Sequence, residues 1–349
     1  MSTDPMPTDG IDVILTHERT DFDALASLLG ASLLYPAALP VLPARMNRNV
    51  RDFVALYRNQ FPFVHARELP RQPINRIILV DTRSANLPKG VRGETTWYVI
   101  DHHTPTPDAS PQWGQSQVKL WHEPVGANAT MLIEKLMRQP IDLTPVQATL
   151  LALGIHEDTG SLTYATSTAR DARCLAWLME RAQGVNLEVL HQFLRHPLSE
   201  PQRTLLDQLV EQSEFLTIAG HTVVIAQADA PGFDDELSTL VHRLRDVHEC
   251  DAVFLIVRLD DLVQVVARSV TDDIDVGAAA RALGGGGHTR AAAAPVRHLS
   301  APQLRDRIVE LLSAHTQPAV TVRHIMTSGR PQVLAPDLRI EEAHLLRRR

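Results

Sequence analysis

The stretch "WYVIDHHTPTP", residues 97–107, joins a strand-like apolar run to three polar groups that can bind a metal or transfer a proton. Residues 97–100 are the apolar run, and Asp101, His102 and His103 follow it directly. The two prolines that come next cannot continue a central strand. A solvated loop would also accept an acid and two histidines, so the rest of the sequence must decide whether these residues form a site.

Composition indicates an ordinary soluble protein. A length of 349 residues suggests two domains and a fragment of a third, and 44% apolar with 21% charged residues is typical of globular chains. The polar start argues against a signal peptide, and no apolar run approaches the ~20 residues of a membrane span. Cys174 and Cys250 lie far apart in the sequence, so we interpret them as reduced core thiols and expect a cytoplasmic protein. A net charge of -7 argues against a broad nucleic-acid-coating surface but allows a short nucleic acid to enter a site end-on.

The first half of the chain alternates strand-like and helix-like stretches. Such alternation predicts a mainly parallel sheet with helices on both faces, and open sheets of this kind place ligands at the carboxyl ends of their strands. We therefore predict an α/β domain over residues 10–190. Its expected strands are 11–17, 74–84 and 96–103, and its expected helices are 23–35, 126–139 and 144–160.

The pattern then changes to a longer helical stretch, "PQRTLLDQLVEQSEF" (201–215), which we interpret as part of a helical linker over residues 191–216. A second, smaller α/β domain is predicted over residues 217–316, with the active-site cleft between the two domains. Its expected strands are 221–229, 251–259 and 262–269, and its expected helices are 275–283 and 301–315. Residues 318–349 begin a further strand and helix.

Polar clusters stand at four successive strand or helix ends of the first domain. Each has an ordinary alternative: Asp21 or Asp23 could cap a helix, Asp81 could sit in a turn, and Gly160 could close the helix that carries Asp158. Their order favours convergence in space, because the ends of parallel strands meet at one edge. Four aspartates carry about four negative charges, which two divalent ions would compensate while imidazoles complete the coordination. The residues concerned are His17, Asp21, Asp23, Asp81, Asp101, His102, His103, Glu157 and Asp158.

A glycine-rich stretch, "GGGGHTRAAAA" (284–294), is the second candidate site. Glycines adopt positive φ and can turn backbone amides toward an anion, and the alanine run after them predicts a helix that begins with free N–H groups. Gly284 could instead end the preceding helix. Four glycines exceed what a cap needs, so we predict a site for a phosphate or terminal nucleotide. Its candidate residues are Arg268, Ser269, Gly285, Gly286, Gly287, His288 and Arg290.

The quoted motifs resemble those of a known family. "HERTDFDALAS", "VDTRS", "IDHH" and "GIHEDTGSLTYATST", followed by "VARS" and "GGGGHTRAAAA", are similar to the DHH phosphoesterases with a DHHA1 domain. The resemblance covers about residues 10–315, and its closest shape is the nanoRNase and pAp-phosphatase type. Thr20 stands where many relatives have proline and Ala294 where glycine often ends the last motif; neither is a candidate ligand.

The resemblance implies a ligand set. His17 and Asp21 would bind one metal, Asp23, His102 and Asp158 would bind the second, and Asp81 would bridge the two. A bridging carboxylate suits ions about 3.5 to 4 Å apart. The mixed ligands suit two Mn²⁺ best, with Mg²⁺, Co²⁺ or Zn²⁺ as substitutes. His103 would act at the scissile phosphate together with the catalytic Asp81, and Asp101 would orient a ligating histidine or a loop amide. His156 and Glu157 would be neighbours.

The resemblance also implies a function: a Mn-dependent phosphodiesterase or exonuclease that hydrolyses short oligonucleotides, RNA and single-stranded DNA, to nucleoside 5'-monophosphates. Related substrates, pAp and cyclic or linear di-adenylate, would use the same groups. An inorganic pyrophosphatase shares the first motifs, but the glycine cluster favours a nucleotide. The resemblance is compatible with a homodimer.

An alternative from another class is a nucleotide-sensing accessory region of a longer protein. Residues 318–349 resemble the truncated start of a CBS domain, a module that often binds an adenine nucleotide. Some relatives are joined to a tRNA nucleotidyltransferase-like region. Intact candidate ligands argue against an inactive domain.

Overall fold

The computed structural model describes residues 10–103, 117–181, 184–195 and 197–326, and the chain divides into two compact units, Met1–Ser199 and Glu200–Arg349. Each unit has its own sheet and its own apolar core. The two-sheet α/β fold class predicted from the sequence is confirmed, and each unit is described by itself below.

The first unit contains a six-stranded sheet in the order β3-β2-β1-β4-β5-β6. Every pair of neighbouring strands is parallel, as predicted. Buried runs such as IIL in β4 satisfy the requirement for a sheet with two covered faces. The strands are β1 (Ile11–Leu15), β2 (Ala38–Leu42), β3 (Val64–His65), β4 (Ile74–Val80), β5 (Thr96–Ile100) and β6 (Val118–Trp121).

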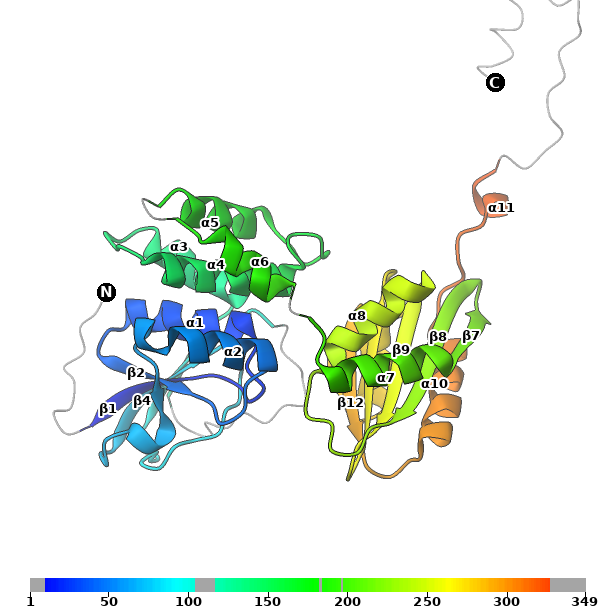
Figure 1. Ribbon diagram of the computed structural model, residues 1–349, viewed down its shortest axis with the longest axis horizontal. Helices are drawn as coiled ribbons and strands as arrows, with labels where there is room; N and C mark the ends of the chain where they lie inside the picture. The colour runs from blue at the N-terminus through cyan, green and yellow to red at the C-terminus, as the bar shows by residue number, and fades with distance from the viewer. Residues whose placement is uncertain (1–9, 104–116, 182–183, 196, 327–349) are drawn as a thin grey trace, which may run out of the picture. The chain divides into compact units, whose positions relative to one another are not determined.

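Helices of the first unit pack against one face of this sheet. The helix α1 is buried along most of its length, and α3 and α4 pack on it, so that the later helices stack beyond α1 (Figure 1). The opposite face carries an apolar cluster built from strands and connecting segments, and no helix residue of the described part of the unit belongs to it. The expected helix layer on both faces is therefore wrong for this face. The helices are α1 (Phe22–Leu34), α2 (Arg48–Tyr57), α3 (Asn128–Leu136), α4 (Pro145–Thr159), α5 (Ala169–Met179) and α6 (Leu187–Leu194), with short 3₁₀ turns at Arg58–Gln60 and Ala66–Glu68.

The strand order explains why the site residues gather. The chain runs from β1 outward to β2 and β3, then crosses back to place β4 on the other side of β1. Such a reversal between adjacent parallel strands opens a crevice at their carboxyl ends. The segment after β1 carries His17 and Asp21, Asp81 follows β4 immediately, and Asp101 follows β5. The sheet thus brings three of the predicted clusters to one edge.

The second unit has a mixed six-stranded sheet in the order β11-β12-β10-β9-β8-β7. Only β8 and β9 pair in parallel among its described neighbours. Its core lies between the sheet and the helices α9 and α10, while α7 and α8 also contact the sheet. The strands are β7 (Ser213–Ile218), β8 (His221–Asp229), β9 (Ala252–Arg258), β10 (Val263–Ser269), β11 (Gly286–His288) and β12 (Ala291–Val296); the helices are α7 (Glu200–Glu211), α8 (Leu237–His248), α9 (Val276–Ala282) and α10 (Ala301–His315).

Two local predictions are wrong. The alanine run after the glycines forms strand β12, because it pairs with β10 on one side and β11 on the other and buries alternate residues; Pro295 also opposes a helix there. Sheet pairing thus overrides the helix propensity of alanine. Likewise the helix expected over residues 201–215 ends at Glu211, because Ser213 to Phe215 pair with β8.

The C-terminal prediction cannot be followed far. After a four-residue helix, α11 (Val322–Ile325), residues 327–349 of the expected CBS segment lie outside the described residues. In the ranges that are described, no helix combines the length and the apolar character that crossing a membrane requires.

Candidate metal centre

The loop after β1 directs an imidazole toward the sheet edge. Thr16 Oγ1 donates to Val80 O (2.8 Å), which ties the end of β1 to the end of β4. His17 Nδ1 lies 2.8 Å from the carbonyl oxygen of Glu18, so its Nε2 faces the cluster. That nitrogen is 3.5 Å from Asp81 Oδ2 and 4.0 Å from Asp21 Oδ1. Burial disfavours a charged imidazole, but the neighbouring Asp81 and Asp21 raise the pKa of His17 to about 10.

Asp21 and Asp23 have structural roles that the cluster does not exclude. Asp21 is the N-cap of α1, and its Oδ1 accepts from the Ala24 amide at 2.9 Å. Asp23, fully buried in the first turn of α1, accepts from the backbone amides of Asn128 (2.6 Å) and Ala129 (2.8 Å) at the start of α3. The capping alternative is therefore correct for Asp21, whereas Asp23 lies inside the first turn of α1 and binds the first amides of α3 instead. These hydrogen bonds hold both carboxylates in place.

Asp81 lies between the two histidines His17 and His102. Its Oδ2 faces His17, whereas its Oδ1 lies 3.5 Å from His102 Nε2 and 3.7 Å from His103 Nδ1. The backbone of Asp81 is left-handed, with φ of 57°, a conformation that costs a non-glycine residue on the order of 1–2 kcal/mol. Its carboxylate is buried, and Oδ1 has no hydrogen-bond partner. A carboxylate with one oxygen toward each side has the shape that a bridging ligand needs.

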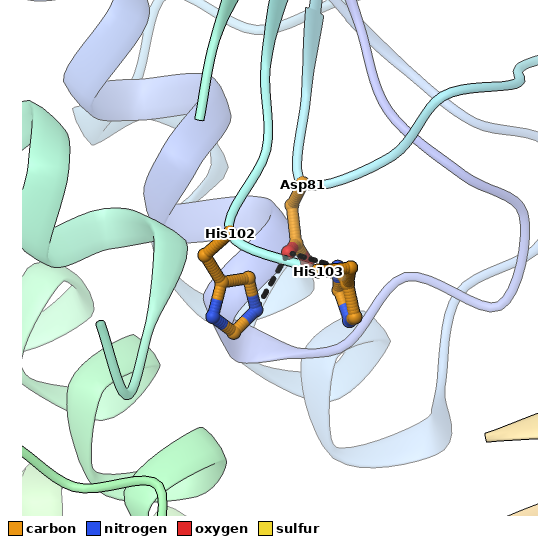
Figure 2. Close-up of side chains that lie close together, drawn as sticks. All are labelled: Asp81, His102 and His103. Atoms are coloured by element: carbon orange, nitrogen blue, oxygen red, sulfur yellow. Dashed lines mark ion pairs between the residues drawn. The ribbon is translucent and has the colours of Figure 1, made fainter. Parts of the chain in front are cut away.

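The adjacent histidines differ in their surroundings, as Figure 2 shows for their contacts with Asp81. His102 Nδ1 lies 3.0 Å from Val125 O, which leaves Nε2 facing the carboxylates. Asp158 Oδ2 is 3.3 Å from that nitrogen, yet the geometry is not that of a hydrogen bond, and Nε2 is buried without a partner. Burial lowers the pKa of His102, but Asp158, Asp81 and Asp23 outweigh it and raise the pKa to about 11.

His103 is more exposed and rests on Asp101. Its Nδ1 lies 2.8 Å from Asp101 Oδ1, and its backbone amide donates to the same oxygen at 3.2 Å. Arg83 Nε donates to the other oxygen of Asp101 at 2.8 Å. Burial raises the pKa of Asp101, but His103 and Arg83 outweigh burial and hold that pKa at about 2. The sequence reasoning expected Asp101 to orient a ligating histidine or a loop amide. Asp101 contacts the backbone amide and the ring of His103, which was not a predicted ligand, and Arg83 is a partner that this reasoning missed.

The last cluster lies at the end of α4. Gly160 closes this helix in the left-handed conformation at φ of 54°, as the structural alternative anticipated, while Asp158 still faces His102. His156 Nδ1 lies 3.1 Å from Ser161 Oγ, away from the carboxylates. Glu157 Oε2 accepts a short hydrogen bond from the Phe22 amide. Glu157 thereby joins the end of α4 to the start of α1, a positioning contact that the sequence did not reveal.

Three groups of side chains place potential ligand atoms within 4.8 Å of one another in the described residues. Two of them correspond to the two ion sites expected from the resemblance, and the third adds His103 to Asp81 and His102. Burial and the charge of Asp81 raise the pKa of Asp21 to about 6, and burial raises that of Asp23 well above its usual value. Burial and the neighbouring charge thus favour the protonated forms of both carboxyl groups. The groups are His17, Asp21 and Asp81; Asp23, His102 and Asp158; and Asp81, His102 and His103.

The glycines of the glycine-rich stretch differ in whether the structure leaves room for a side chain. A Cβ on Gly285 would lie 2.2 Å from Ala293 O, and one on Gly287, where φ is 136°, would lie 2.3 Å from Ala291 O. Both glycines are thus required by the close approach of β11 to β12. A Cβ on Gly286 would meet nothing within 4 Å, at a backbone conformation open to other residues. The fold does not explain this glycine.

The remaining candidates of the second unit are engaged with protein partners. Arg290 forms a two-point ion pair with Asp272, at 2.7 and 3.1 Å. The hydroxyl of Ser269 is buried and donates to Thr271 O at 2.7 Å. Arg268 pairs in register with Ala291, which pairs in turn with His288, so Arg268 and His288 share one face of the sheet. The structure thus brings two of the predicted basic groups together and gives Ser269 a structural contact.

A parallel sheet with acids and histidines at its carboxyl edge, followed by a unit with a mixed sheet, defines a two-domain α/β protein with a candidate metal site. The profile "DHH family, N-terminal domain" matches residues 13–155, and the DHHA1 domain matches residues 220–315. The chain therefore contains the N-terminal domain of the DHH family followed by a DHHA1 domain.

Known proteins similar to the chain include several that are longer. It is 35% identical over 327 residues to an A-adding tRNA nucleotidyltransferase of Geobacter sulfurreducens, a match that covers 91% of this chain and 36% of that protein. It is 26% identical over 329 residues to the cyclic-di-AMP phosphodiesterase PdeA of Listeria monocytogenes, covering 86% and 47%. An exopolyphosphatase-related protein from Bacteroides fragilis has the same fold, with a TM-score of 0.66, 15% identity and coverage of 88% and 94%. The chain thus spans less than half the length of these two curated relatives.

Proposed function

We propose that this chain is a Mn²⁺-dependent phosphodiesterase that hydrolyses short oligonucleotides to nucleoside 5'-monophosphates. The observation that carries this proposal is the pair of buried atoms at the sheet edge, Asp81 Oδ1 and His102 Nε2, which have no hydrogen-bond partner. Buried polar atoms without partners are costly unless a ligand satisfies them. Both atoms face carboxylates and imidazoles, the donor types that Mn²⁺ accepts.

The residues fit two divalent ions. His17 and Asp21 would hold one, Asp23, His102 and Asp158 the other, and the two oxygens of Asp81 would face both. Such a pair supplies charge stabilisation to the phosphoryl group and activates water. The hydrogen bond of His102 Nδ1 to a carbonyl fixes the tautomer that presents Nε2, the support that ligating histidines usually have.

The chain's own residues define the rest of the chemistry. His103 is half-exposed beside Asp81 and is held through Nδ1, and we assign its imidazole the role of donating a proton to the leaving oxygen. Asp101 contacts the His103 ring, and Arg83 in turn holds Asp101 in place. We assign the recognition of the terminal phosphate to the second unit, where Gly286 leaves its backbone open and Arg268 and His288 share a face.

An activity panel tests this proposal and its closest alternatives. The Mn²⁺-loaded chain should hydrolyse di- to tetranucleotides faster than longer RNA or single-stranded DNA. pAp and cyclic di-adenylate belong in the same panel, since a similar protein is a cyclic-di-AMP phosphodiesterase. Faster turnover of cyclic di-adenylate than of any dinucleotide would transfer the proposal to that substrate. Rapid pyrophosphate hydrolysis with no action on nucleotides would overturn it.

A second candidate function is that of a nucleotide-binding accessory region within a longer protein. The match over 91% of this chain but only 36% of an A-adding tRNA nucleotidyltransferase favours it. On this alternative the chain would bind short nucleotides in the presence of Mn²⁺ without turning them over. Equilibrium binding of a dinucleotide, measured beside its hydrolysis, separates the two: binding with negligible turnover supports the accessory role, and binding with turnover supports the enzyme.

A further inference from the structure

Asn128 is a fully buried polar residue where several segments of the metal centre meet. It is the first residue of α3, and its backbone amide donates to Asp23 Oδ2 at 2.6 Å. Its side chain reaches Ser27 of α1, with 2.9 Å between the amide group and Ser27 Oγ. Asn128 thus touches α1 through its backbone and through its side chain.

The hydrogen-bond network fixes the orientation of the Asn128 amide. With the amide nitrogen toward Ile100, this nitrogen donates to Ile100 O at 3.2 Å, and the oxygen accepts from the Asp81 backbone amide at 3.1 Å and from Ser27 Oγ at 2.9 Å. The reverse orientation would set two acceptors against each other at Ile100 and two donors at Asp81. A buried site cannot sustain both conflicts, so the first orientation holds.

These contacts join the segments that carry the predicted ligands. Asp81 follows β4, and Ile100 is the last residue of β5, two positions before His102. The Asp81 amide also donates to Ile100 O at 2.9 Å, so Asn128 completes a closed set of bonds between the two strand ends. Asp81 has left-handed backbone there, a conformation that needs support from its surroundings.

The chemistry at this position requires a short primary amide. One group must accept from the Asp81 amide while another donates to the Ile100 carbonyl, and the amide of asparagine or glutamine offers both in a form that does not titrate. Glutamine is one methylene longer, and the site is fully buried. Leucine has a similar size but can make neither bond, and serine offers a single hydroxyl.

We propose that Asn128 is a positioning residue of the metal centre, which holds Asp81 and the strand end before His102 in the arrangement that binds the ions. The inference rests on the proposed two-metal function. Residues that orient metal ligands typically contribute 10–100-fold to metal affinity. We therefore expect Asn128→Leu and Asn128→Ser to lower Mn²⁺ affinity by about 10-fold or more.

The test compares metal affinity with fold stability. Mn²⁺ binding to the full chain is measured by calorimetry and by electron paramagnetic resonance of the free ion, and stability by urea unfolding of the metal-free protein. The control is Thr149→Val, which removes an equally buried hydroxyl whose partners, Pro145 O and the Asn186 amide, carry no predicted ligand. The control should lose stability and keep the wild-type Mn²⁺ affinity.

The outcomes separate the inference from the function on which it rests. If wild-type protein binds no Mn²⁺, the two-metal proposal fails and the inference fails with it. If wild type binds and a folded Asn128 variant binds within about 2-fold of Thr149→Val, Asn128 is structural only and the inference is overturned while the proposed function stands. Should Asn128→Leu not fold, Asn128→Ser decides. Serine is smaller than asparagine and fits the buried site, and its single hydroxyl cannot replace both hydrogen bonds of the amide.

Discussion

Binding of two Mn²⁺ ions should release about two to three protons at about pH 7.5, because ligands must be deprotonated to bind a metal. In the metal-free protein the pKa of His17 is about 10 and that of His102 about 11, so both imidazoles are protonated at that pH. Each histidine then contributes about one proton.

The carboxylates set the remainder. Asp21, with a pKa of about 6, is mostly ionised at about pH 7.5 and adds little, but it should add about half a proton at about pH 6. Burial raises the pKa of Asp23 well above its usual value, so Asp23 shifts the release in the same direction. Because protons compete with the ions for the same atoms, Mn²⁺ affinity should rise with pH throughout the range below the pKa values of the two histidines.

Calorimetry in two buffers of different ionisation enthalpy measures the released protons directly. His17→Gln should release about one proton fewer than wild type, since an amide cannot titrate, and His102→Gln should do the same. Thr149→Val serves as the control, because its hydroxyl contacts Pro145 O and the Asn186 amide and no predicted ligand. Binding with no net release, or an unchanged count in both histidine variants, would refute the assignment of these imidazoles as ligands.

Three further outcomes follow from individual contacts. Asp81→Ala should abolish Mn²⁺-dependent hydrolysis and preserve the circular dichroism spectrum; turnover near the wild-type rate would exclude a bridging role. Gly287→Ala should lower the free energy of unfolding by about 1–3 kcal/mol through its backbone conformation, whereas Gly286→Ala should leave urea stability unchanged and raise KM for a dinucleotide; equal stability losses would contradict this distinction. Glu157→Gln keeps an acceptor for the Phe22 amide but removes a charge from a helix N-terminus, so it should cost about 0.3–1 kcal/mol of stability, and a loss several-fold larger would assign Glu157 a role beyond this contact.

The convergence of the candidate ligands could be predicted from the sequence because most of them adjoin regular elements. Asp81 directly follows a buried strand, and Asp158 lies in the last turn of a helix. The carboxyl ends of neighbouring parallel strands lie at one edge of the sheet. The order of the motifs along the sequence was therefore sufficient to predict that the residues after these strands lie close together. The alanine run at β12 shows where such reasoning ends: its helix propensity is high, but pairing with two neighbouring strands outweighs a preference worth less than about 1 kcal/mol per residue.

The contacts that support the candidate ligands could not be predicted from the sequence, for a different physical reason. Asp23 and Asn128 are 105 positions apart in the chain, and their bond exists only because α3 packs on α1. A polar residue at the start of a helix is ordinary in sequence, since caps and first turns favour polar side chains. What distinguishes Asn128 is complete burial with acceptors and donors on both sides. Burial of that kind is a property of the assembled unit, so the residues that hold ligands in place require the structure even where the ligands themselves do not.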